Sequence, residues 1–354
     1  MNNIKLIAVG DIILNTKTDY HPFEKVMNVL ETKDILFGNI ETVLSVEGKK
    51  SKKSVILNSP PESVKYLIDA DFDVLNIANN HMLDLGIEGL KSTLNVLDKS
   101  NLNYIGINCA KSNSNYLILE KKSIKLGFIG YTIGRFKQNK EPSLCKLNEK
   151  QIISDIKSLK TKCDFVIVSL HWGTENVFYP SPKQIDLAHR LIDNGATLIL
   201  GHHPHVVQGI EKYKNGLIAY SLGNFQFDTK ISQSKTNDSV IFSVDFDENG
   251  IRGYKLIPVV INDNFIPMIA EGEVKDNILM FVNDVSEPLC INKFTNKWWF
   301  EEISKEYLAG NLNSYRKRVK KYGIIPLIEC IIWLMTPFCI KCYKGLVTKY
   351  LFDR

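Results

Sequence analysis

Carboxylate, amide and imidazole side chains stand at the ends of short apolar runs throughout the first two thirds of this sequence. The residues concerned are Asp11, Glu41, Asn80, His81, His171, His203 and His205. Carboxylate oxygen, amide oxygen and imidazole nitrogen together suit Mn²⁺, Fe or Zn²⁺, whereas an all-oxygen set would favour Mg²⁺ or Ca²⁺. These donors outnumber what one tetrahedral ion needs. Two ions about 3.5–4 Å apart that share a carboxylate and activate a water commonly perform phosphoester hydrolysis.

The segment Gly201-His202-His203-Pro204-His205 concentrates three of these imidazoles. In an extended segment, residues i and i+2 point to the same face. We therefore expect His203 and His205 to face the site together, while His202 points away.

Each residue also has a purely structural interpretation. Asp11 could cap a helix or a turn, and Asn80 or Asn224 could occupy a left-handed turn position. A histidine near a strand end is often a hydrogen-bonded loop residue. However, five of the seven histidines follow apolar runs. A structural account would have to explain that placement five separate times, so we favour a metal site, with Asn224 as structural support.

The elements that must position these residues alternate between strands and helices. Strands are predicted at 4–9, 35–37, 73–78, 104–107, 124–131, 164–170, 197–200 and 217–221. Amphipathic helices are predicted at 63–70 and 183–193, and a late hairpin joins 239–246 to 251–261. Strand–helix alternation indicates an α/β fold. Because ligands bind at the carboxyl ends of strands in open α/β sheets, the polar side chains should converge on one patch.

Composition narrows the class of protein. Of the 354 residues, 44% are hydrophobic and 23% are charged, which is typical of a globular protein and not of a disordered, collagenous or polytopic membrane chain. No GxxxxGK[ST] or GxSxG motif is present. This argues against ATP-driven ligation and against a serine hydrolase.

The first apolar run is too short for a signal peptide, so we expect a cytoplasmic protein with reduced thiols.

Several motifs resemble those of the CapA-type proteins of poly-γ-glutamate and capsule synthesis. They are Gly10-Asp11, Asn39-Ile40-Glu41, Asn79-Asn80-His81, His171-Trp172-Gly173, Gly201-His202-His203-Pro204-His205 and Ser221-Leu222-Gly223-Asn224-Phe225. Together they cover roughly residues 4–260. That family is in turn similar to the calcineurin-like metallophosphoesterases. The resemblance implies an α/β fold of two sheets in a sandwich flanked by helices (αββα), with metals at the sheet edge. The end of the chain, after about residue 270, is expected to add a C-terminal helical appendage.

The resemblance also implies a role for each residue. Asp11 and His205 would bind a first metal, and Glu41 would stand where a bridging carboxylate usually lies. Asn80, His171 and His203 would bind a second metal, while His81 would contact the phosphoryl group or protonate the leaving oxygen. The sequence departs from the metallophosphoesterase pattern at two positions, so whether the site holds one ion or two stays open. The usual Asp-x-His is Asp11-Ile12-Ile13 here, and Glu41 replaces the usual Asp.

Two functions follow as expectations. The first is a metal-dependent hydrolase of capsule or cell-envelope polymer synthesis, acting on an anionic or phosphorylated envelope precursor or polymer. The second is a catalytically weak capsule-assembly component, which would use the same pocket to bind an anionic polymer or a lipid-linked precursor. The missing imidazole favours the second, and the remaining ligands favour the first.

Basic residues gather at the end of the chain. Nine basic and two acidic residues lie in 316–354, although the net charge of the whole chain is only +5. We divide the chain into a catalytic domain, 1–270, and an appendage, 271–354. The basic run at 316–321 precedes an apolar stretch, 323–340, which suits a segment at the inner surface of an anionic membrane. The alternative is a helix docked on the body. The near-neutral body argues against nucleic-acid binding.

Overall fold

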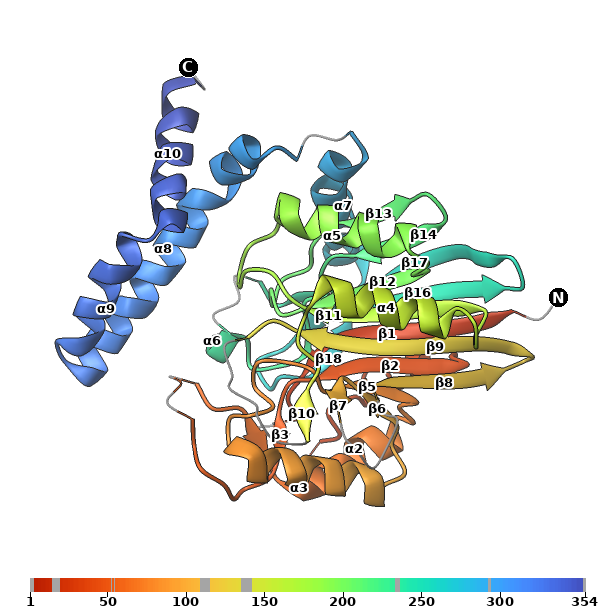
Figure 1. Cartoon of the computed structure of the whole chain (residues 1–354). Helices are drawn as coiled ribbons and strands as arrows, with labels where there is room; N and C mark the ends of the chain where they lie inside the picture. Colours follow the sequence, from red (N-terminus) through yellow and green to blue (C-terminus); the bar gives the residue numbers. More distant parts are fainter. Residues whose placement is uncertain are drawn as a thin grey trace.

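The computed structural model is a two-sheet sandwich with helices on its outer faces (Figure 1). The described residues are 3–14, 20–51, 53, 55–108, 115–134, 142–232, 236–291 and 294–352. The predicted α/β class and the metallophosphoesterase-like architecture are confirmed, and helices follow the sandwich at the C-terminus.

One sheet carries the N-terminal strands, and within the described ranges it has eight strands in the order β18-β17-β16-β1-β2-β5-β6, with β15 also paired to β1. The strands are β1 (Ile4–Ile12), β2 (Ile35–Ile40), β5 (Val74–Asn76), β6 (Tyr104–Ile105), β15 (Asn224–Gln226), β16 (Asp238–Asp247), β17 (Gly250–Ile261) and β18 (Pro267–Ile269). The neighbours β1, β2, β5 and β6 run parallel, whereas β16 and β17 form the predicted antiparallel hairpin.

The second sheet has six described strands in the order β13-β14-β12-β11-β9-β8. They are β8 (Tyr116–Lys121), β9 (Ile124–Thr132), β11 (Phe165–His171), β12 (Leu198–His202), β13 (Ile210–Tyr213) and β14 (Gly216–Ala219). Its centre, β9, β11, β12 and β14, is parallel, so the carboxyl ends of these strands share one edge. Two small ribbons complete the strands: β3 (Val43–Leu44) with β4 (Asn58–Ser59), and β7 (Ile107–Asn108) with β10 (Ser143–Leu144).

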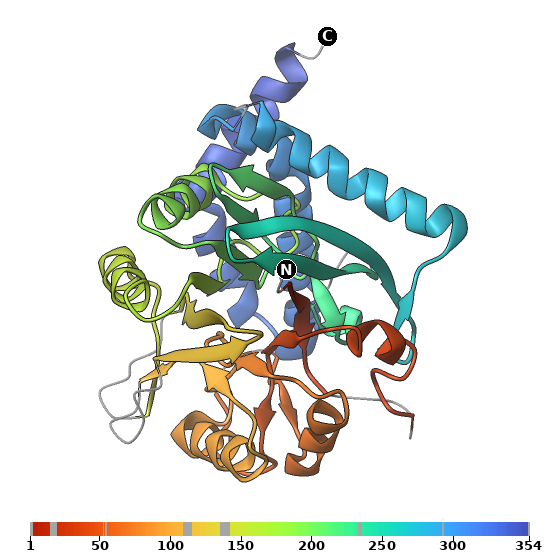
Figure 2. The ribbon, with the colours of Figure 1, turned by 90° about the vertical axis from the view of Figure 1, so that its right-hand side faces the viewer.

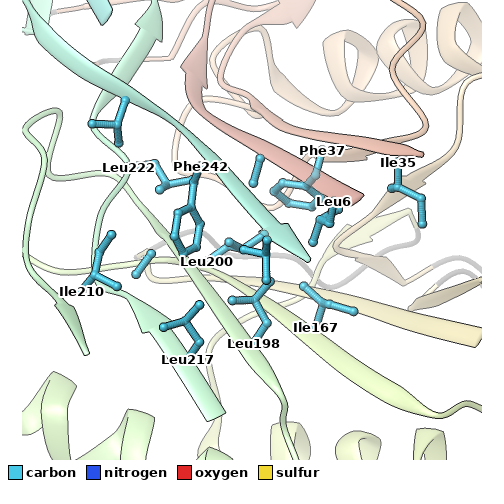
Figure 3. Close-up of a cluster of buried hydrophobic side chains, with 14 of the residues drawn as sticks. Leu6, Ile35, Phe37, Ile167, Leu198, Leu200, Ile210, Leu217, Leu222 and Phe242 are labelled. Atoms are coloured by element: carbon cyan, nitrogen blue, oxygen red, sulfur yellow. The ribbon is translucent and has the colours of Figure 1, made fainter. Parts of the chain in front are cut away.

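Apolar side chains from both sheets fill the space between them (Figure 3). Leu6 and Phe37 from the first sheet meet Leu198 and Leu200 from the second, and all four are fully buried. The ring of Phe37 stacks on Phe128 with centroids 6.3 Å apart. Burying each such side chain contributes about 1.5–3 kcal/mol. This core fixes one sheet against the other and so aligns the strand ends.

Helices cover the outer faces, as the perpendicular view shows (Figure 2). The covering helices are α2 (Val64–Asp69) and α3 (Gly86–Lys99) on the first sheet, and α4 (Glu149–Leu159) and α5 (Pro182–Asp193) on the second. The start of α5 is encoded locally: Ser181 and Gln184 form a reciprocal capping box around the first-turn Pro182. Short helical turns occur at α1 (Met27–Leu30), η1 (Pro61–Ser63) and α6 (Thr229–Ser232).

Four helices follow the sandwich. They are α7 (Gly272–Cys290), α8 (Asn296–Tyr322), α9 (Ile325–Leu334) and α10 (Pro337–Phe352). The side chains of Ile278 and Val282 in α7 are part of the core between the sheets. The helix α8 reaches the body through Trp299, whose indole N–H donates to the Tyr179 carbonyl at 3.0 Å. The predicted division near residue 270 stays a prediction.

The apolar stretch 323–340 is divided between α9 and α10. The chain bends by 62° between them, at the point where Pro337 starts a new helix. Along the described chain, no individual helix has the length and hydropathy to cross a bilayer, although α9 together with Pro337–Leu351 meets both criteria as a bent pair.

Candidate metal centre

The candidate ligands meet where the strands of both sheets end. Asp11 lies near the end of β1 and Glu41 directly follows β2, both in the first sheet. His171 is the last residue of β11 and His203 directly follows β12, both in the second. The predicted patch therefore lies at the shared edge of two sheets, not along one open sheet.

Two overlapping groups of ligand atoms form there, each within 4.8 Å: Asp11, Glu41 and His205, and Glu41, His171 and His203. The shortest links are 3.4 Å from His171 Nε2 to Glu41 Oε1 and 3.4 Å from His205 Nδ1 to Asp11 Oδ2. Glu41 belongs to both groups. Its carboxylate therefore occupies the position from which one side chain can serve two ions.

Asn80 joins the second group. Its Oδ1 lies 2.9 Å from His171 Nε2. An amide oxygen in that place can share a cation with the imidazole nitrogen, or accept its proton. All six side chains predicted as ligands are thus brought together.

His81 lies at the rim of the same cluster. Its Nε2 is 4.0 Å from Glu41 Oε1, while its Nδ1 is 2.6 Å from Asp84 Oδ2. The ammonium of Lys53 lies 2.9 Å from the other oxygen of Asp84. Burial lowers the pKa of His81, although the hydrogen bond to Asp84 opposes that shift. This arrangement fixes the ring with Nε2 toward the cluster.

The donor atoms fit a divalent cation. Both carboxylate oxygens of Glu41 and Nδ1 of His203 are buried, and none has a hydrogen-bond partner in the described part of the chain. Leaving a buried polar group without a partner costs about 1–3 kcal/mol, and more for a charged group. A cation bound by Glu41 would satisfy its oxygens, and His203 belongs to the same ligand group.

The two buried carboxylates, Asp11 and Glu41, require positive charge nearby to stay ionised. Burial works against ionisation of Asp11, but hydrogen bonds from His202 and His205 outweigh it and hold the pKa of Asp11 well below its usual range. Burial and the neighbouring Asp11 charge raise the pKa of Glu41 well above its usual range. Burial alone would lower the pKa of His205, but Glu41 and Asp11 raise it to about 10. A proton on His205 or a divalent cation can supply this positive charge.

The other two imidazoles stay neutral near pH 7. Burial lowers the pKa of His203 to about 4, and burial together with the charge of His203 lowers the pKa of His171 well below its usual range. Neutral imidazole is the form that binds metal ions.

The prediction that His203-Pro204-His205 is extended was wrong, although His203 and His205 do face the site as expected. His203 and His205 have φ values of 96° and 59°, so the segment is a turn and not an extended strand. Both rings face the cluster, with centroids 6.1 Å apart. His202 does not point away: its Nδ1 lies 3.2 Å from Asp11 Oδ1. As the last residue of β12, His202 follows Leu200 on the inner face of the sheet.

A chain of buried amides supports Asp11 and was not predicted. Asn39 donates to Asp11 Oδ1 at 2.8 Å, and Asn76 donates to Asn39 Oδ1 at 2.8 Å. The alternation of side chains along a strand places Asn39 on the same face as Glu41, which is the signal that could have revealed it. Asn224, predicted as support, has Oδ1 2.9 Å from His205 Nδ1.

Carboxylates, an amide and imidazoles gathered at the edge of a helix-flanked double sheet define a metallophosphoesterase-like protein. Residues 5–229 match the sequence family described as bacterial capsule synthesis protein PGA_cap. The chain belongs to that family.

Two relatives are named for capsule or polymer synthesis. The chain is 34% identical to the capsule biosynthesis protein CapA of Bacillus anthracis, over 72% of this chain and 64% of that protein. It is 33% identical to the PGA biosynthesis protein CapA of Bacillus subtilis (strain 168), over 73% of this chain and 70% of that one. The chain thus spans about two thirds of the length of these relatives.

A solved structure supports the fold alone. The crystal structure of a hypothetical protein from Thermus thermophilus superposes with a TM-score of 0.50 at 15% identity, covering 72% of this chain and 98% of that one.

Proposed function

We propose that this protein is a metal-dependent phosphoester hydrolase acting in capsule or cell-envelope polymer synthesis. The observation that carries the proposal is Glu41, a fully buried carboxylate whose two oxygens have no hydrogen-bond partner among the described residues and which is shared by two groups of ligands. Membership of a capsule synthesis family supports the biological setting.

The residues divide into two tasks. Asp11, Glu41, Asn80, His171, His203 and His205 would hold one or two divalent ions. A bound Mn, Fe or Zn ion would neutralise charge on a phosphoryl group and lower the pKa of water. His81 would contact the phosphoryl group through Nε2 or, in its imidazolium form, donate a proton from Nε2 to the leaving oxygen, while Asp84 stays bonded to Nδ1.

A binding function is the second candidate, because position 13, two residues after Asp11, offers no donor. Ile13 packs instead in an apolar cluster with Leu57 and Phe227. A cavity of about 800 Å³ adjoins the cluster through His203, and its charged lining includes Lys230 and Lys317 beside the acidic Glu175, Asp263 and Glu306, so the two lysines would have to supply the contacts to an anion. Such a site would hold an anionic or phosphorylated precursor or polymer without cleaving it rapidly.

One experiment separates the two. Hydrolysis of an aryl phosphate with Mn²⁺ supplied is compared between the wild type and the Asn80→Ala, His203→Ala double variant. We expect Mn²⁺-dependent turnover in the wild type alone. Bound Mn²⁺ with no turnover, together with retention of poly-γ-glutamate, would favour the binding function. No bound metal, and rates equal to those of the double variant, would remove the hydrolase.

We also propose that α9 and α10 rest on an anionic membrane surface. Large apolar side chains are exposed along α9 and beside it: Ile324, Ile325, Ile328, Ile331, Ile332 and Met335. The basic run 316–321 precedes this surface, and Lys341 and Lys344 follow it. An apolar face flanked by basic side chains matches a bilayer interface with anionic lipids.

The test is co-sedimentation with vesicles containing phosphatidylserine. We expect an Ile325→Glu, Ile332→Glu variant to lose most of the binding. Ile68→Glu is the matched control, because Ile68 is also exposed but lies on α2 of the body. Equal binding by the double variant, or no binding by the wild type, would contradict the proposal. Loss of binding on raising the salt concentration would identify the basic residues as part of the contact.

A further inference from the structure

Glu175 is an acidic residue that none of the roles above uses. It lies in the loop after β11, and its carboxylate forms a third group with His203 and His205 in which all ligand atoms are within 4.8 Å. Unlike Glu41, Glu175 is exposed, and it lines the cavity beside the cluster.

The loop that carries Glu175 is anchored at both ends. Before it, the backbone N–H of Trp172 donates to the His202 carbonyl at 3.0 Å, and its indole N–H donates to the Tyr220 carbonyl at 3.1 Å. After it, the N–H of Asn176 donates to the Pro204 carbonyl at 2.8 Å. The turn that carries Glu175 is therefore tied directly to the turn that carries His203 and His205.

The backbone conformation favours glycine where this loop leaves the strand. Gly173 has a φ of 94°, and a Cβ atom there would lie 2.7 Å from the end of the Gln184 side chain, which would have to move. Glycine adopts this conformation without strain. The backbone is thus built to bring Glu175 to the two imidazoles.

The position of Glu175 complements that of Glu41. His205 belongs to the group with Asp11 and Glu41, and His203 belongs to the group with His171 and Glu41. Glu175 approaches one imidazole from each group, on the side that faces the cavity. The Nδ1 atom of His203 is buried without a hydrogen-bond partner among the described residues, which is an independent observation that this imidazole can accept a ligand.

We infer that Glu175 is a further cation ligand, which closes the centre on the cavity side. The inference rests on the proposed function, since it requires a cation at Glu41, His203 and His205. Mn²⁺ and Fe accept carboxylate together with imidazole donors. The competing role for Glu175 is proton transfer or substrate contact without any contribution to metal affinity.

Mn²⁺ titration by calorimetry on the full chain distinguishes these roles without measuring turnover. We expect Glu175→Gln to weaken at least one Mn²⁺ site by tenfold or more, and Glu175→Asp to bind with intermediate affinity because it keeps the charge. Glu306→Gln is the matched control: Glu306 lines the same cavity from α8, outside the three ligand groups. Thermal melts of each variant would establish that it folds.

The outcomes separate this inference from the proposed function. If the wild type binds Mn²⁺ and Glu175→Gln binds it equally well, the ligand role is wrong while the hydrolase proposal stands. An equal loss in Glu306→Gln would show a general effect of cavity charge and would also overturn the ligand role. A wild type that binds neither Mn²⁺ nor, in the same titration, Zn²⁺ or Fe²⁺ would end both proposals.

Discussion

The Oε1 atom of Glu41 lies 3.4 Å from Nε2 of His171, although Glu41 follows a strand of one sheet and His171 ends a strand of the other. The core between the sheets must close before these atoms meet. Cation binding at this contact would therefore be coupled to folding.

Mn²⁺ should stabilise the folded protein. A ligand that binds only the native state at 100 times its dissociation constant adds about 2.7 kcal/mol to the free energy of unfolding. We expect the melting temperature of the wild type to rise with Mn²⁺ and that of Glu41→Gln to stay constant, as measured by calorimetry. A similar rise in Glu41→Gln would show that the ion binds elsewhere.

The pair of His81 and Asp84 should control turnover without controlling metal affinity. A positioned general acid typically contributes about 10²–10⁴-fold to rate. We expect His81→Gln to lower kcat on an aryl phosphate by that factor. Asp84→Asn should lower it by a smaller one, because the ring loses the negative charge of its 2.6 Å partner but keeps an acceptor there. Mn²⁺ affinity, measured by calorimetry, should stay within a few fold in both. Parallel loss of Mn²⁺ affinity and kcat would make His81 a ligand instead.

The pH dependence of stability should reveal the proton on His205. Its pKa rises from 6.5 to about 10 on folding, so the stabilisation is fully present below pH 6.5 and is lost as the pH rises toward 10. In EDTA-treated protein, the free energy of unfolding should fall between about pH 6.5 and 8.5 by up to about 1.4 kcal/mol per pH unit. Urea titrations of the wild type and His205→Gln would measure this. A slope equally steep in the variant would contradict the assignment.

The amide chain beneath Asp11 should contribute more to the free energy of unfolding than an amide on the surface. Asn39→Ala leaves Asp11 Oδ1 and the Asn76 amide short of a buried partner, which should cost about 1–3 kcal/mol. Asn103→Ala, at an exposed hydrogen bond, should cost less than about 0.5 kcal/mol. Chemical denaturation compares the two. Equal costs would mean that the amide chain adds no stability.

Much of the scaffold could be predicted because its signals are local. Apolar runs of strand length mark the parallel strands, and Ser181-Pro182 with Gln184 marks the start of α5. The six expected ligands and His81 could be predicted to converge because each stands at the end of such a run.

Features set by turns and long-range contacts could not be predicted. The positive φ values at His203 and His205 end the strand alternation after His202, so the directions of these two side chains depend on the turn. Glu175 reaches the cluster only because Asn176 bonds to Pro204, a contact between two loops. The bend between α9 and α10 differs from these features, because Pro337 marks it locally in the sequence.

The most direct test of the central claim is a crystal structure of the Mn²⁺-loaded protein with anomalous scattering recorded at the manganese edge. We predict an anomalous peak coordinated by Glu41 and His203, with His171 and Asn80 beside it, and a second peak near Asp11 and His205 if two ions bind. A well-occupied manganese elsewhere, or no peak among these side chains at saturating Mn²⁺, would contradict the account.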